Sequence, residues 1–161
     1  MPSTHKKVVV CKLDRDSVQG YVNPTAFVSG GRLEMLNTAG QVVTLDLADV
    51  KGVYFVREFA DPGSVAARKT FATRPRAEGL WVRMRFRDNE VMEGLMPNDL
   101  MQVSAEGYLV TPPDTRSNTQ RIFVPRTALL EMSVLAVIGG RAAARRRTAA
   151  ADARQVPMFS E

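Results

Sequence analysis

The chain has 161 residues, of which 45% are hydrophobic and 24% charged, and its 22 Lys and Arg against 17 Asp and Glu give a formal net charge of +5. This composition is ordinary for a globular protein, excludes a wholly disordered chain, and fits one compact domain or two small ones. No stretch approaches about 18 consecutive apolar residues, so we expect a cytoplasmic protein without a membrane span or an export signal.

The first part of the chain, residues 6–56, has the pattern of short β-strands separated by turns. β-Branched and aromatic residues dominate the strand-like segments, and Asp and Gly occupy the breaks between them. The expected strands are Lys7–Leu13, Ser17–Val22, Arg32–Leu36, Gln41–Leu47 and Gly52–Val56. The single cysteine, Cys11, falls in the first strand and cannot form an internal disulfide, so we expect a buried and inert thiol.

Residues 57–79 differ in composition and are interpreted as a linker, because they are rich in Arg, Ala, Pro and Gly. Within this linker, Ser64 is a suitable N-cap for a short helix that runs through Phe71 and ends before Pro75.

Residues 80–138 repeat the plan of the first part. Gly94 aligns with Gly20 and Val124 aligns with Leu45, which indicates an internal duplication and predicts two similar small antiparallel β-barrels. The alternative is one intertwined sheet. The strands expected here are Leu80–Phe86, Val91–Met96, Gly107–Thr111, Gln120–Val124 and Leu130–Val137.

The chain changes character at residues 139–161, where five arginines against two acidic residues give a local charge of +3 and leave +2 for the other 138 residues. This stretch has no apolar face to bury until its last residues, so we expect a flexible tail that is disordered or partly helical. A basic tail on a nearly neutral body indicates nucleic acid as a partner, or a purely solubilising role. The expected nucleic-acid-binding residues are Arg141, Arg145, Arg146 and Arg147.

The segment Val18-Gln19-Gly20-Tyr21-Val22 follows an apolar strand and a polar turn, and it resembles the second strand of the Sm-like barrel family in its bacterial Hfq form. A glycine at position 20 suits the sharp bend of that strand. The resemblance implies an Sm/SH3-like barrel over residues 6–56 and a second one over residues 80–138, similar to uncharacterised bacterial proteins with tandem domains of this kind. The Lys-His pair with which Hfq binds uridine-rich RNA would fall near Leu47-Ala48, so that RNA pocket is absent.

The PilZ family of cyclic-di-GMP-binding barrels is a weaker match. Ser17 and Gly20 supply its Ser-x-x-Gly element, but the arginine pair that should precede this element is missing. The clamp for guanine and phosphate is therefore not encoded.

The last residues of the tail, Gln155-Val156-Pro157-Met158-Phe159, resemble the peptide by which bacterial replication and repair proteins bind the DNA sliding clamp. That motif has Gln first, Leu or Met fourth and Phe fifth. The resemblance implies that Gln155 hydrogen-bonds the pocket rim while Met158 and Phe159 fill an apolar cleft. Alternatively, the apolar residues of the tail pack back onto the folded body.

Residues suited to catalysis are few. The only histidine, His5, lies in a polar N-terminal segment, so no histidine-based catalytic or metal site is expected. The carboxylate pairs Asp14/Asp16 and Asp88/Glu90 fall in predicted hairpin turns, where turn formation accounts for them. We expect no enzymatic activity, cofactor or metal.

Arg83, Arg85 and Arg87 alternate with apolar residues, which places all three on one face of a strand. This arginine ridge is a second candidate for phosphate contacts, and a solvated outer face is the alternative.

Together these features predict a non-catalytic adaptor tethered by its tail to the sliding clamp and nearby nucleic acid. The second hypothesis is a structural or oligomerising Sm-like protein that binds RNA and has a merely solubilising tail.

Overall fold

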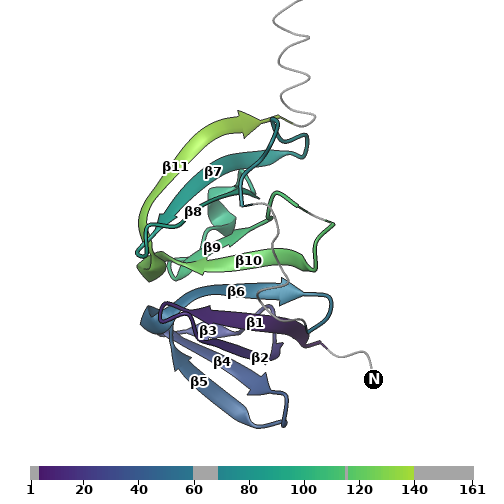
Figure 1. Ribbon diagram of the computed structural model, residues 1–161, viewed down its shortest axis with the longest axis vertical. Helices are drawn as coiled ribbons and strands as arrows, with labels where there is room; N and C mark the ends of the chain where they lie inside the picture. Colours follow the sequence, from purple (N-terminus) through teal and green to yellow (C-terminus); the bar gives the residue numbers. More distant parts are fainter. Residues whose placement is uncertain (1–3, 60–68, 115, 140–161) are drawn as a thin grey trace, which may run out of the picture.

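The computed structural model of the chain describes residues 4–59, 69–114 and 116–139. These residues form antiparallel β-strands and three 3-10 helices, with no α-helix among them (Figure 1). The prediction of a mainly β, antiparallel protein is confirmed. All ten strands expected from the sequence are present, with ends shifted by at most two residues, whereas one short strand and the 3-10 helices were not predicted.

The first half of the molecule is a five-strand arrangement with one additional short strand. Its strands lie in the order β6-β1-β2-β4-β5, and β3 pairs with β4 beside the end of β2. The 3-10 helix η1 precedes the last strand and begins where the Asp46 carboxylate accepts a hydrogen bond from Ala48 N (3.0 Å). The elements are β1 (Lys6–Lys12), β2 (Ser17–Val22), β3 (Val28–Ser29), β4 (Arg32–Asn37), β5 (Val42–Asp46), η1 (Leu47–Asp49) and β6 (Val50–Val56).

The second half has the same strand order, β11-β7-β8-β9-β10. β8 and β9 meet at one bridge, where Leu95 and Thr111 exchange two backbone hydrogen bonds of 2.9 and 2.7 Å. A 3-10 helix again precedes the last strand. The elements are β7 (Gly79–Phe86), β8 (Val91–Met96), η3 (Leu100–Gln102), β9 (Gly107–Val110), β10 (Thr119–Pro125), η4 (Arg126–Ala128) and β11 (Leu129–Ile138).

The first hairpin turns of the two halves have the same construction. Arg15 and Asn89 adopt positive φ angles of 72° and 67°, and each donates its backbone N–H to the carbonyl three residues earlier (3.0 and 2.9 Å). The carboxylates of Asp14 and Asp88 each accept a hydrogen bond from the backbone N–H two residues later (2.9 and 3.0 Å). These acidic residues therefore build turns, as the sequence predicted.

Gly20 and Gly94 occupy equivalent positions, opposite Val8 and Val82 of the first strand of each half. A Cβ at Gly20 would collide with the carbonyl oxygen of Leu36 on β4, so only glycine permits this close approach of strands.

The two halves are not separate barrels. β6 pairs with β10, which joins strands of both halves into one eight-stranded sheet, while β11, β7 and β8 form a second sheet. Neither sheet closes on itself within the described residues. The expectation of two closed tandem barrels is not confirmed, because strand patterns in a sequence do not reveal which edges pair.

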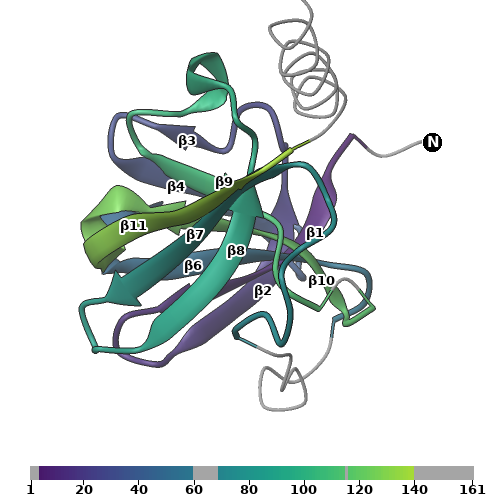
Figure 2. The same ribbon diagram turned by 90° about the horizontal axis from the view of Figure 1, so that it is seen from above.

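Each half has its own apolar core, and the two cores exchange side chains across the β6–β10 pair. Phe123 of β10 lies in the first core, whereas Tyr54 of β6 packs against the second. The second core is sandwiched between the β11-β7-β8 sheet and the β9–β10 end of the larger sheet, whose strands cross beneath it in Figure 2.

The predicted helix from Ser64 falls mostly on residues 60–68, outside the described residues, and Lys69 to Phe71 are not helical. Within the described ranges, no helix has the length and apolar character needed to cross a membrane.

Candidate functional site: the sheet edges

The residues of the tail that are predicted to bind the sliding clamp or nucleic acid lie outside the described residues. They are Arg141, Arg145, Arg146, Arg147, Gln155, Met158 and Phe159. Their roles remain predictions, and the folded body must be searched separately for a site.

The junction of the two halves combines polar and apolar contacts between distant parts of the described chain. Phe123 lies opposite Val53 in the β10–β6 register, and its ring makes an edge-to-face contact with Phe27 (centroids 5.2 Å apart). Tyr54 lies opposite Ile122, and burial raises the pKa of its phenol, so the side chain stays neutral. Around Tyr54 and Phe123, the sheet is thus covered on both faces.

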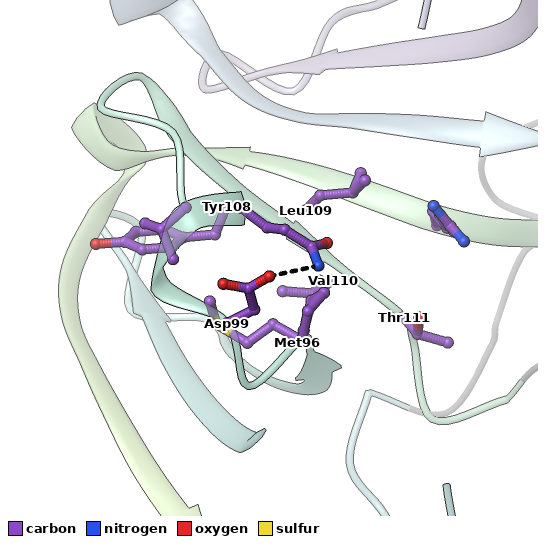
Figure 3. Close-up of a pocket in the computed structure, with 10 residues that line it drawn as sticks. Met96, Asp99, Tyr108, Leu109, Val110 and Thr111 are labelled. Atoms are coloured by element: carbon purple, nitrogen blue, oxygen red, sulfur yellow. Dashed lines mark hydrogen bonds between the residues drawn. The ribbon is translucent and has the colours of Figure 1, made fainter. Parts of the chain in front are cut away.

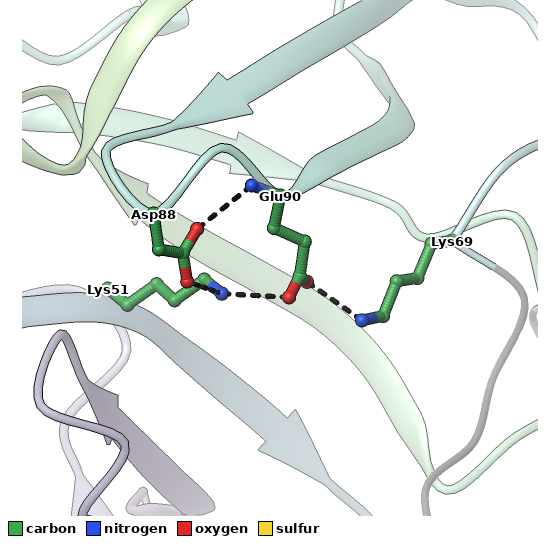
Figure 4. A network of polar contacts seen from close by, with 4 residues as sticks. All are labelled: Lys51, Lys69, Asp88 and Glu90. Carbon is green, nitrogen blue, oxygen red and sulfur yellow. Dashed lines mark hydrogen bonds and ion pairs between the residues drawn. The ribbon is translucent and has the colours of Figure 1, made fainter.

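A charged cluster closes one side of this junction (Figure 4). Lys51 of β6 donates to the carboxylates of Asp88 (2.6 Å) and Glu90 (3.0 Å) in the β7–β8 turn, and Lys69 pairs with the other oxygen of Glu90 (3.0 Å). The Lys51 ammonium also lies 5.1 Å from the centroid of the Phe86 ring, a cation–π contact. We call these four charged residues, Lys51, Lys69, Asp88 and Glu90, the ionic clasp.

The clasp shifts the pKa of its members towards their charged forms. Burial alone would lower the pKa of Lys51, but the hydrogen bonds to Asp88 and Glu90 outweigh burial and raise it. The hydrogen bond from Lys51 lowers the pKa of Asp88. Burial would raise the pKa of Glu90, but the two lysines outweigh it and lower the pKa. The clasp therefore joins the two halves through hydrogen bonds between charged groups.

The outer edge of β11 has no neighbouring strand among the described residues, although its sequence is that of an internal strand. From Met132 to Ile138 it carries no charged residue and no proline, the features that usually protect an edge. Its apolar side chains are exposed instead: Leu130, Val134, Leu135 and Val137.

The outer edge of β5 is likewise unpaired in the described structure. Val43 and Leu45 point into the first core, whereas Val42, at one end of the strand, is 64% exposed. Among the described residues, β5 and β11 are thus edge strands whose outer side has no neighbouring strand.

The arginine ridge is formed only in part. Arg83 and Arg85 lie exposed on β7, and Arg87 follows the end of the strand. Arg85 pairs with Glu131 on the neighbouring strand (3.7 Å), and Glu93 lies opposite Arg83 in the β7–β8 register. This arrangement is typical of a solvated outer face with mixed charge.

A cavity of about 170 Å³ lies between η3 and β9 (Figure 3), and no sequence pattern predicted it. Its one lining carboxylate, Asp99, accepts hydrogen bonds from the backbone of Met101 and the amide of Gln102, both at 3.0 Å. The hydrogen bonds from Gln102 and Met101 lower the pKa of Asp99, and the Asp99 carboxylate caps the 3-10 helix η3. Within the described part of the chain, no three or more His, Cys, Asp or Glu lie together as a metal site would need.

Comparison with known proteins identifies a family for this chain. A family model described as a family of unknown function (DUF6982) matches residues 4–136, most of the chain. No curated protein and no solved structure matches the chain.

Proposed function

The chain belongs to DUF6982, a family of unknown function, and from this premise we propose that it is a non-catalytic adaptor that acts by binding other proteins. One observation carries the proposal: the most exposed apolar strand of the folded body is the unpaired β11. Soluble proteins rarely leave a long apolar edge uncovered, because it templates pairing with another chain.

The use of the charged residues supports the same class of function. Asp14, Asp46, Asp88 and Asp99 all accept hydrogen bonds from local backbone N–H groups, and Glu90 belongs to the ionic clasp. These carboxylates stabilise turns, 3-10 helices and the junction of the halves. We therefore assign the binding function to the sheet edges and the exposed surfaces.

We further propose that the two halves are tandem Sm-like units. The common strand order, the 3-10 helix before the last strand of each half and the closely approached glycine at the same position of each second strand support this relationship. The units are open and share an edge, unlike two independent barrels.

The proposed partner of the tail is the bacterial sliding clamp, which Gln155, Met158 and Phe159 would bind, and Arg141 with Arg145 to Arg147 would add salt-dependent contacts to nearby nucleic acid. The support is the spacing of the terminal motif beyond an Ala/Arg-rich segment. The body would then be held at the clamp while its free edges remain available.

The test is to titrate purified sliding clamp with the full chain, with Phe159→Ala and with Val134→Lys. We expect Phe159→Ala to weaken binding by about thirtyfold, because loss of a buried aromatic anchor costs on the order of 2 kcal/mol. Val134→Lys alters only the β11 edge and should bind as the unmodified chain does. No binding by the unmodified chain at high-micromolar concentration would overturn the clamp assignment.

A further inference from the structure

We propose that the free edge of β11 pairs with the free edge of β5 of a second copy of this chain, head to tail, in the register that β6 and β10 use inside the chain. The inference rests on the proposed function, since it names the partner of the exposed edge.

The four strands concerned form two equivalent pairs. η1 begins at Leu47 and η4 begins at Arg126, a separation of 79 positions (126 − 47). The same separation relates Val50 to Leu129, the first residues of β6 and β11. β10 is therefore the counterpart of β5, and β11 is the counterpart of β6.

The internal junction joins the last strand of the first half, β6, to the fourth strand of the second half, β10. The fourth strand of the first half, β5, and the last strand of the second half, β11, each keep one side without a neighbouring strand among the described residues. The free edges of β5 and β11 are thus the counterparts of β10 and β6, the two strands that already pair within the chain.

The internal register fixes the expected intermolecular register. Inside the chain, Arg121 lies opposite Phe55. Subtracting 79 from the first and adding 79 to the second places Val42 of one copy opposite Val134 of another. The same shift applied to Phe123 and Val53 places Thr44 opposite Met132.

The solvent exposure of Val42 and Val134 agrees with this register, which follows from strand pairing alone. Val42 is 64% exposed and Val134 is 57% exposed, two of the most exposed apolar residues on the strands of the described chain. Phe55, the internal counterpart of Val134, is only 9% exposed, whereas Arg121, the internal counterpart of Val42, is exposed. Directly opposed β-branched side chains would cover each other and stabilise the pair.

Val134 also marks where the second core is open. It lies opposite Val82, which is fully buried, so it belongs to the core face of β7 and β11. In the first half the corresponding face of β6 is covered by Phe123 of β10. Val42 and Thr44 of a second copy would cover the second core in the same way.

The two edges lie at opposite ends of the molecule in Figure 1, with β11 at one end and β5 at the other. One copy can therefore contact two others at once. A contact between different surfaces is heterologous, and it produces a ring if the rotation closes and an open filament if it does not.

The contact between copies would lack the ionic clasp. The counterpart of Lys51 is Leu130, and the turn that faces it in the second copy carries Asp14 and Asp16, the counterparts of Asp88 and Glu90. We therefore expect a weaker, largely apolar contact whose extent depends on protein concentration.

The first experiment measures sedimentation velocity of the full chain over a range of concentrations. We expect species larger than the monomer that grow with concentration. Val134→Lys and Val42→Lys should each weaken association at least about tenfold, because both edges are needed and a lysine protects an edge strand. Val91→Lys, an exposed valine on β8 away from both edges, is the matched control and should associate normally.

The second experiment identifies the pairing. Val42→Cys and Val134→Cys chains of different mass, each with Cys11→Ser, are mixed and oxidised. Opposed strand residues lie within disulfide range, so we expect the Val42→Cys chain to link to the Val134→Cys chain. Links only between two Val134→Cys chains would mean a symmetric β11–β11 contact and would overturn the proposal.

A third outcome concerns the tail of the same chain. If the unmodified chain stays monomeric and Phe159→Ala increases amide hydrogen exchange in β11, the tail covers this edge and the second copy is excluded. Clamp binding is measured independently, so loss of self-association leaves the proposed adaptor function standing, and loss of clamp binding leaves the edge pairing standing.

Discussion

The internal junction and the free edges are made from equivalent strands. The junction is packed with buried side chains and joined by ion pairs, whereas the edges have no neighbouring strand among the described residues. At the junction, aromatic residues Phe123 and Tyr54 reach across into the core of the other half. Their counterparts, Thr44 and Ser133, are smaller and polar. The difference indicates that one edge contact is permanent, since it is part of the fold, whereas the other depends on a partner.

The largest expected effect separates the two regions directly. Phe123→Ala should destabilise the protein by about 3–5 kcal/mol, because it empties a buried position that both halves share. Thr44→Ala, at the equivalent position on the free edge, should change the free energy of unfolding by less than about 0.5 kcal/mol. Denaturant unfolding measures both, and equal effects would contradict the assignment of β10 and β5 as filled and free counterparts.

The second effect comes from the ionic clasp. Lys51→Met should cost about 1–2 kcal/mol at neutral pH, since it leaves two partly buried carboxylates with fewer hydrogen bonds. Leu130→Met changes the equivalent position of β11 and should be nearly neutral. If the lysine variant were as stable as the leucine variant, the clasp would contribute nothing to the junction.

The pH dependence of stability should identify the clasp independently. The pKa values of Asp88 and Glu90 are lowered in the folded state, so their contribution is complete above the unfolded values of about 3.9 and 4.3. It is lost as the pH falls through the lower folded values. Thermal unfolding from pH 6 down to pH 3 should therefore show a steeper loss for the unmodified chain than for Lys51→Met.

The smallest effect is expected at the free edges themselves. Val42→Lys and Val134→Lys should each alter the thermal unfolding of dilute, monomeric protein by no more than about 0.5 kcal/mol, because both side chains are already exposed. A large loss of monomer stability would mean that these valines are structural residues, and the edges would then no longer be free.

The sequence was informative about local structure and less so about the site. Alternating apolar residues and turn signals located the strands to within two residues, and Gly20 and Gly94 marked equivalent positions in the two halves. The short strand β3 and the 3-10 helices carry too few residues for a periodic pattern. The free edge of β11 was visible only as an ordinary apolar strand, because periodicity reports which side chains are buried against a sheet and not whether the strand has a second neighbour.

By itself, the sequence determined the mainly β character, the repeated order of strands and the acidic turns, because these depend on backbone preferences and on side chains near one another in the chain. Only the tertiary structure decided that β6 pairs with β10, that Lys51 meets Asp88 and Glu90, and that β5 and β11 remain free. Those contacts join residues tens of positions apart, and the backbone groups along any strand edge are chemically alike. The choice of partner therefore follows from which cores the paired edges cover, a property of the assembled fold rather than of any single segment.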